Sequence, residues 1–115
     1  MNNNSLIEEM RECLITQVND ERMLMASHIK PWRIANDIEK IDKYNGLLLT
    51  PTYDRLFDQG FISFNDDGTL LVSPYLSPLN IKRLSLKPNA KYNLLYNKKR
   101  SEYLEFHRQN IFKKG

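Results

Sequence analysis

Two acidic residues four positions apart could hold a metal ion. Asp54 and Asp58 fall in a segment that we expect to be helical, and this spacing puts both carboxylates on one side of a helix. Two stacked negative charges repel each other unless a cation lies between them, and hard divalent ions prefer carboxylate oxygens. His28 could accept a proton near neutral pH, as imidazole does. Metal-assisted acid–base chemistry is therefore one chemistry that these residue types allow.

Each of these residues also has an ordinary structural explanation. An aspartate in the first turn of a helix, such as Asp54, stabilises the helix dipole. His28 could simply close a core strand. Asn45 precedes Gly46, and Asn–Gly pairs are frequent in turns. Taken one at a time, the residues leave the structural and the chemical interpretations open.

Three short segments, taken together, carry more information. They are Ala26-Ser27-His28-Ile29-Lys30-Pro31-Trp32, then Asn45-Gly46-Leu47-Leu48-Leu49, and then Asp54-Arg55-Leu56-Phe57-Asp58-Gln59-Gly60, which begins nine residues after Asn45. With these segments the chain resembles HNH endonucleases, specifically a bacterial branch with Ser-His-Ile-Lys-Pro-Trp, Asn-Gly-Leu-Leu-Leu and Asp-x-Leu-Phe-Asp motifs. The resemblance runs from about residue 13 to about residue 112 and includes a hairpin at 61–74 and the closing run at 103–108.

The resemblance implies a ββα-metal fold and a role for each motif residue. His28 takes the place of the general base that removes a proton from the attacking water, and loss of such a base typically lowers the rate ~10²–10⁴-fold. Asn45 takes the place of the residue that ties the loop to the histidine's backbone and so orients the base. Asp54 falls where the family's last motif residue binds the metal, and Asp58, one turn later, is the second candidate ligand.

Ser27 is the main departure from the family pattern. Many family members have aspartate or histidine there as another metal ligand, whereas a neutral serine is a poor one, so we expect the ion to bind weakly and to keep more waters. Cys13 is the only cysteine, which excludes an intramolecular disulfide and a cysteine zinc site. A divalent ion held mainly by oxygen, Mg²⁺ or Mn²⁺, is the expected cofactor.

Basic residues near the motifs are candidates for binding nucleic acid. Lys30, Arg33 and Arg55 flank the proposed site, and Arg108 lies in the closing helical segment. Such contacts to phosphates give affinity without sequence choice. Each of these side chains could instead be a solvated surface residue.

Two aromatic side chains have an expected place in the fold. His107 either braces or supplements the site, or is only a helix-face histidine. Trp32 is the only tryptophan, and we expect it to pack against Pro31 and the core rather than to stack on a base.

Charge is distributed unevenly along the 115 residues. Residues 1–81 carry a net charge of −5 and residues 82–115 a net charge of +8, within a total of +3. A basic segment beside an acidic body suits an enzyme that binds a polyanion, but it equally suits a solvated basic helix. No apolar run is long enough to span a bilayer and no leader opens the chain, so we expect a cytoplasmic protein.

Local patterns predict the elements that must position these residues. A first helix runs from Asn4 or Ser5 to about Cys13, and a later one starts with Thr50 as its N-cap and ends at Gly60. Strands are predicted at 23–29 and 46–49, a polar loop at 31–44 with one turn of helix around 34–41, a hairpin at 61–64 and 69–72, and a helix at 98–112. The expected fold is α+β, a single HNH domain over 1–115 with its ββα-metal core at about 23–60, the hairpin at about 61–73 and a basic C-terminal helical segment at about 82–115.

The function expected from the resemblance is metal-dependent endonucleolytic cleavage of nucleic acid, with double-stranded DNA as the expected substrate, as in relatives that act in restriction or phage defence. Relatives often attach this module to a larger specificity domain. Without such a domain, we expect cleavage with little sequence preference, or cleavage directed to its target by a homodimer or a separate specificity partner. One alternative is a catalytically impaired nucleic-acid-binding protein derived from such a nuclease, and another is a regulatory protein that holds an acidic partner.

Overall fold

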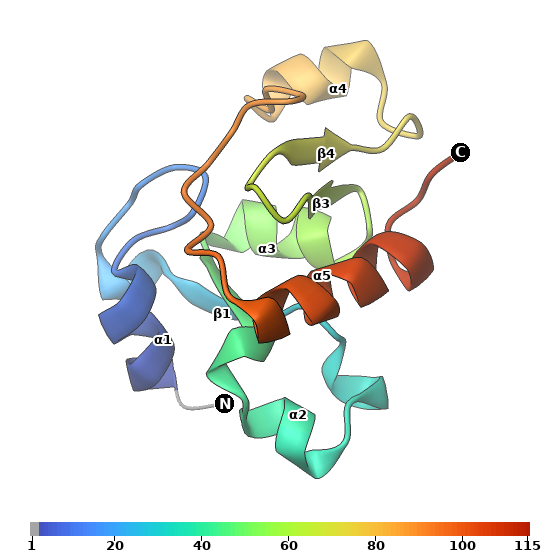
Figure 1. Cartoon of the computed structure of the whole chain (residues 1–115). Helices are drawn as coiled ribbons and strands as arrows, with labels where there is room; N and C mark the ends of the chain where they lie inside the picture. The colour runs from blue at the N-terminus through green and yellow to red at the C-terminus, as the bar shows by residue number, and fades with distance from the viewer. Residues whose placement is uncertain (1–2) are drawn as a thin grey trace.

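A computed structural model describes residues 3–115, and it confirms the α+β class (Figure 1). The longer elements are α1 (Asn3–Met10), β1 (Met25–His28), α2 (Asp37–Ile41), β2 (Gly46–Leu49), α3 (Pro51–Asp58), β3 (Ile62–Phe64), β4 (Leu70–Val72), α4 (Pro78–Arg83) and α5 (Lys98–Asn110). Short 3-10 turns, η1 (Glu21–Met23), η2 (Trp32–Ile34) and η3 (Lys43–Asn45), lie between α1 and β2. Within residues 3–115, each helix is too short or too polar to cross a membrane.

The centre of the fold is a two-stranded antiparallel sheet with a helix against it. β1 pairs with β2 so that Ser27 faces Leu47 and His28 faces Gly46. α3 follows β2 after a single residue and packs against both strands. The ββα arrangement that the resemblance implied is therefore present at 25–58.

Apolar packing holds this unit together. All four residues of β2 are buried, as expected for a short strand covered on both sides. α3 turns Tyr53, Leu56 and Phe57 inward. α1 adds its apolar side to this core, because Leu6 and Met10 are buried, as is Cys13 just beyond its end.

The predicted start of α3 after Thr50 is confirmed, but the predicted bounds of the first helix and the capping bond of Thr50 were wrong. The first helix already includes Asn3 and ends at Met10, because Arg11 takes a left-handed conformation with φ of 64°. Thr50 precedes α3, but its hydroxyl makes no capping hydrogen bond. The thiol of Cys13 lies 3.7 Å from that hydroxyl and accepts the Thr50 backbone N–H at 3.4 Å.

The predicted hairpin is confirmed as β3 and β4. Gly68 closes its turn with φ of +90°, and its N–H donates to the Asn65 carbonyl at 2.9 Å. A side chain there would come within 1.9 Å of the Tyr92 carbonyl oxygen, so the turn needs glycine for both reasons.

The C-terminal segment is partly held by its charges. Four ion pairs join residues 82–115 to carboxylates of the preceding body, and they are Lys91–Asp67, Lys99–Asp42, Arg100–Glu9 and Arg108–Asp66. The basic segment therefore packs on the acidic body, which neither of the two sequence interpretations had foreseen. α5 confirms the last predicted helix, whereas α4 was not predicted.

Candidate active site

Ser27 and Asp54 meet where β1 packs on α3. Ser27 is only 3% exposed, and its hydroxyl donates to the Asp54 carboxylate with an Oγ–Oδ1 distance of 2.5 Å. Asp54 reaches this position because Pro51 starts α3 one residue after β2 and makes Asp54 the fourth helical residue. The two positions that the resemblance links to the metal are thus in direct contact.

His28 follows Ser27 at the end of β1 and is half-buried. Its Nε2 lies 3.2 Å from the backbone carbonyl oxygen of Lys40, just before η3. A carbonyl oxygen only accepts hydrogen bonds, so in the neutral ring Nε2 must carry the proton. Nδ1 then has the free lone pair, and it has no hydrogen-bond partner among residues 3–115.

Asn45 links the loop between the strands to the end of β1. It is fully buried, and its Oδ1 accepts the Lys30 N–H at 2.7 Å. Its Nδ2 donates to the carbonyl oxygens of Lys30 and Glu39, at 3.3 and 3.1 Å. Because Lys40 follows Glu39 directly, the same side chain binds the peptide next to the one whose carbonyl contacts His28.

The donors at this site suit only a loosely held hard ion. Residues 3–115 contain no group of three His, Cys, Asp or Glu side chains that could surround a metal. The Asp54 carboxylate and the neutral Ser27 hydroxyl would supply two oxygens, and Mg²⁺ commonly binds through one or two carboxylates together with waters and substrate phosphate. Asp58 is exposed, and its hydrogen bond is to the Gln59 amide at 3.5 Å, not to Asp54 or Ser27. The residues therefore fit an ion that needs the substrate to complete its coordination.

The four basic residues singled out from the sequence fall into two pairs. Lys30 and Arg108 are engaged in ion pairs, with Glu39 at 2.9 Å and with Asp66 at 3.1 Å. Arg33 and Arg55 are exposed, and within the described part of the chain their side chains form no ion pair. Only the second pair is available to a phosphate without breaking an internal contact.

His107 is 1% exposed and connects three elements. Its Nε2 donates to the Phe57 carbonyl oxygen at 2.9 Å, and its Nδ1 accepts the hydroxyl of Ser63 at 2.8 Å. Its ring also stacks on Phe57, with centroids 3.9 Å apart. Burial lowers the pKa of His107 to about 4, so it stays neutral and braces α3, β3 and α5 against one another.

Trp32 corrects the sequence prediction, because it does not pack into the core. The side chain is 57% exposed. Its ring meets the His28 ring edge-on, with centroids 5.6 Å apart, and the Lys40 ammonium lies 4.6 Å from its centroid. The tryptophan therefore stands at the surface beside the candidate base.

Sequence reasoning missed the residues of α5 that hold η3. Arg100 is 1% exposed, forms an ion pair with Glu9 at 2.8 Å and donates to the carbonyl oxygen of Lys43 at 3.4 Å. Asp42 accepts hydrogen bonds from Lys99 and from the Tyr103 hydroxyl. Burial acts to raise the pKa of Asp42, but these hydrogen bonds outweigh it and the pKa is lowered. Residues near the C-terminus thus hold the 3-10 turn that ends in Asn45. No local sequence pattern indicates these contacts.

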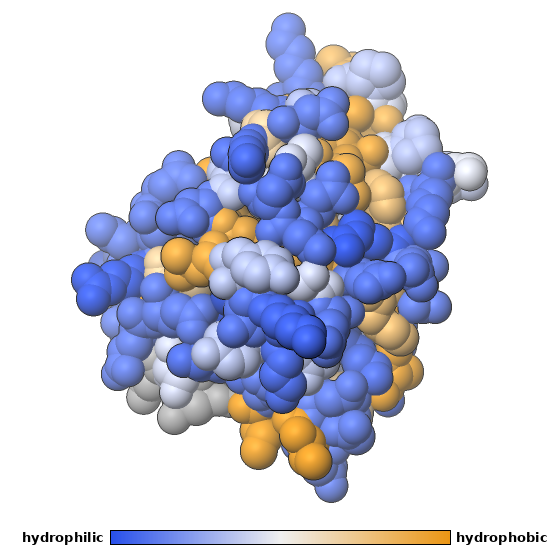
Figure 2. Space-filling view, in the orientation of Figure 1, coloured by the Kyte–Doolittle hydropathy of each residue, from blue (hydrophilic) through white to orange (hydrophobic). Residues whose placement is uncertain are grey.

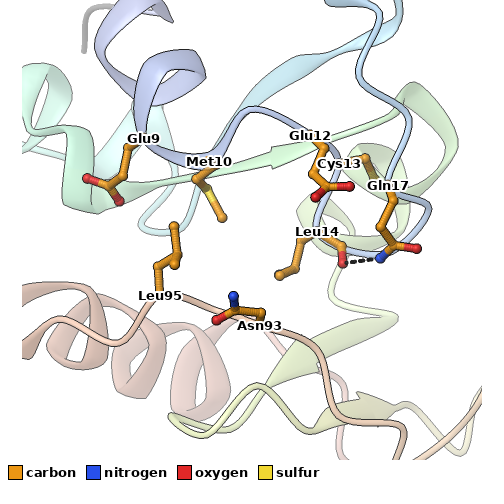
Figure 3. A pocket seen from close by; sticks show the side chains of 8 residues that line it. All are labelled: Glu9, Met10, Glu12, Cys13, Leu14, Gln17, Asn93 and Leu95. Atoms are coloured by element: carbon orange, nitrogen blue, oxygen red, sulfur yellow. Dashed lines mark hydrogen bonds between the residues drawn. The ribbon is translucent and has the colours of Figure 1, made fainter.

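A cavity of about 190 Å³ lies apart from this site, between the end of α1 and the segment 93–95 (Figure 3). Glu9 and Glu12 line it from one side and Asn93 from the other, while the Gln17 amide folds back onto the Leu14 carbonyl. It contains none of the residues expected to do chemistry.

The segment that builds the site matches a known family. Residues 13–65, just under half of the chain, match the family of HNH endonucleases. This segment contains β1, β2 and α3 with Ser27, His28, Asn45 and Asp54. Among curated proteins, none matches the chain. The segment is therefore similar to nucleases of this family, which act on nucleic acid and generally use a divalent metal ion.

Proposed function

We propose that the chain is a metal-assisted endonuclease that hydrolyses phosphodiester bonds of DNA, with His28 as the general base. The observation that carries the proposal is the hydrogen bond from His28 Nε2 to the Lys40 carbonyl, one residue along β1 from the Ser27–Asp54 contact. This bond assigns the proton to one ring nitrogen and leaves the other to accept a proton from water.

The reaction is an in-line displacement at phosphorus. Nδ1 of His28 removes a proton from a water molecule, the water oxygen bonds to phosphorus, and the bond to the leaving 3′ oxygen breaks. A divalent ion bound at Asp54 would neutralise charge on the phosphate and the leaving oxygen. Asn45 is a positioning residue, since it acts on the loop that holds the imidazole. Arg33 and Arg55 contact neighbouring phosphates.

A plasmid-nicking assay tests the proposal. Purified protein is incubated with supercoiled plasmid and Mg²⁺ or Mn²⁺, with EDTA as the metal-free control. We expect nicking that EDTA abolishes and that His28→Ala lowers by ~10²–10⁴-fold. The matched control is Arg22→Ala, an exposed side chain whose ion pair is with Asp20 and not with the site. Nicking that persists unchanged in His28→Ala would assign the activity to a contaminant and refute the proposed base.

The second candidate function is binding without cleavage. It is favoured by Ser27, whose neutral hydroxyl occupies the position where many family members have a metal-binding side chain. DNA retention that weakens steeply with salt, without nicking in any metal, is the result that would favour it.

A further inference from the structure

We propose that Trp32 is a stacking platform for an unpaired nucleobase next to the bond that His28 attacks. The inference rests on the proposed function and extends it to the substrate. It begins from the position of Trp32, the only tryptophan, which is 57% exposed although it ends the motif segment 26–32.

The backbone around Trp32 is ordered, so its exposure is part of the structure. Pro31 leads into the 3-10 turn η2, and its carbonyl oxygen accepts the N–H groups of Ile34 and Ala35 at 3.1 and 3.0 Å. Ala35 is buried and anchors the end of the turn. The turn therefore presents the indole outward at a fixed place beside β1.

The neighbours of the indole match the chemistry of a nucleotide. The His28 ring lies edge-on to it at 5.6 Å, and the ammonium of Lys40 lies 4.6 Å from its centroid. The carbonyl of the same Lys40 holds His28 Nε2. An aromatic face, a cation and the candidate general base thus occur together. A nucleotide offers a nucleobase to the aromatic face and a phosphate to the cation.

A protein partner is the rival occupant of this surface. Ile34, Ile38 and Ile41 are also exposed, and Figure 2 shows hydrophobic side chains gathered at the end of the molecule that carries α2. Lysine, however, is depleted in the buried centre of protein interfaces, and here Lys40 lies on the indole itself. Charge complementarity therefore favours nucleic acid at Trp32. Because bases in a duplex are already stacked on each other, the base that binds must be unpaired or extruded.

The fluorescence of the single tryptophan tests the proposal directly. The probes are a labelled oligothymidine of about 12 nucleotides and an abasic strand of equal length and charge, both in EDTA at low salt. We expect oligothymidine to quench Trp32 over the same concentration range in which its anisotropy rises, whereas the abasic strand binds without quenching. Trp32→Leu should weaken oligothymidine binding roughly 5- to 150-fold and leave the abasic strand unaffected.

Tyr75→Leu is the matched control, because Tyr75 is 67% exposed and follows β4, a strand that lies away from α2 (Figure 1). It should change neither affinity. Oligothymidine binding without quenching, or equal losses for both strands in Trp32→Leu, would overturn the stacking proposal and leave the proposed nuclease standing. Self-association that shields Trp32 without nucleic acid would overturn it in favour of a second copy. A protein that binds neither strand and nicks no plasmid would refute the proposed function as well.

Discussion

Mild acid should destabilise this protein through His107. The folded state holds the pKa of His107 at about 4, against an ordinary value of 6.5, because the ring is buried between Phe57 and Ser63. The unfolded chain therefore binds a proton more readily than the folded one between these two values. The stability that this pKa difference contributes is fully present above pH 6.5 and is lost as the pH falls toward 4. The total loss of folding free energy is about 3 kcal/mol. Between about pH 7 and pH 5 alone the loss is about 2 kcal/mol.

Urea denaturation at these two pH values measures the effect. The matched variant is His107→Gln, whose amide is neutral at both pH values and retains one donor and one acceptor. We expect the variant to be less stable than the parent at pH 7, since it loses the stacking on Phe57. On going from pH 7 to pH 5, however, the variant should lose about 2 kcal/mol less stability than the parent does. The other histidine, His28, is unchanged between the two proteins, so its contribution cancels in the comparison. An equal loss in parent and variant would show that His107 is not the residue that binds the proton.

Three further substitutions test the site and its supports. Ser27→Asp places a second carboxylate against Asp54, so without metal the two charges should repel by about 4 kcal/mol. A thermal-shift assay should show a lower Tm in EDTA that Mn²⁺ restores. A Tm that does not change with Mn²⁺ would argue against an ion at Asp54. Asn45→Ala removes three hydrogen bonds from buried backbone groups and should lower the free energy of unfolding in urea by about 3 kcal/mol, more than any exposed Asn→Ala change. Arg100→Met should destabilise by about 1.5–3 kcal/mol because Glu9 loses the closer of its two cationic partners and keeps only Lys43, at 3.3 Å. Adding Glu9→Gln should recover part of that loss, and strictly additive effects would contradict the ion pair.

The elements nearest the site could be predicted because short-range signals specify them. The Leu47–Leu49 run requires burial, and the step from Thr50 to Pro51 starts a helix wherever tertiary packing allows one. The fold class and the hairpin follow from the same kind of pattern. The roles of His28, Asn45 and Asp54 come from the family resemblance and stay predictions, although the structure brings the three segments together.

The remainder depends on contacts that lie far apart along the chain. Arg100 meets Glu9, and no periodicity links the two positions. Trp32 was expected inside because tryptophan usually gains from burial, yet the turn after Pro31 directs it outward. The Thr50 hydroxyl was expected to cap α3, but it lies against the Cys13 thiol at 3.7 Å and makes no capping hydrogen bond. In each case a distant or tertiary partner overrides the local preference.

The contacts of α5 with η3 have a consequence for how the segment that matches the family can be used. Residues 13–65 contain every group proposed to do chemistry, but Arg100 and His107, which hold that segment in shape, come from beyond it. Leu104, on the same helix, is completely buried. Excising the matched segment as a cassette for fusion to a targeting domain should give an unfolded peptide, whereas a fusion that keeps α5 should retain its architecture.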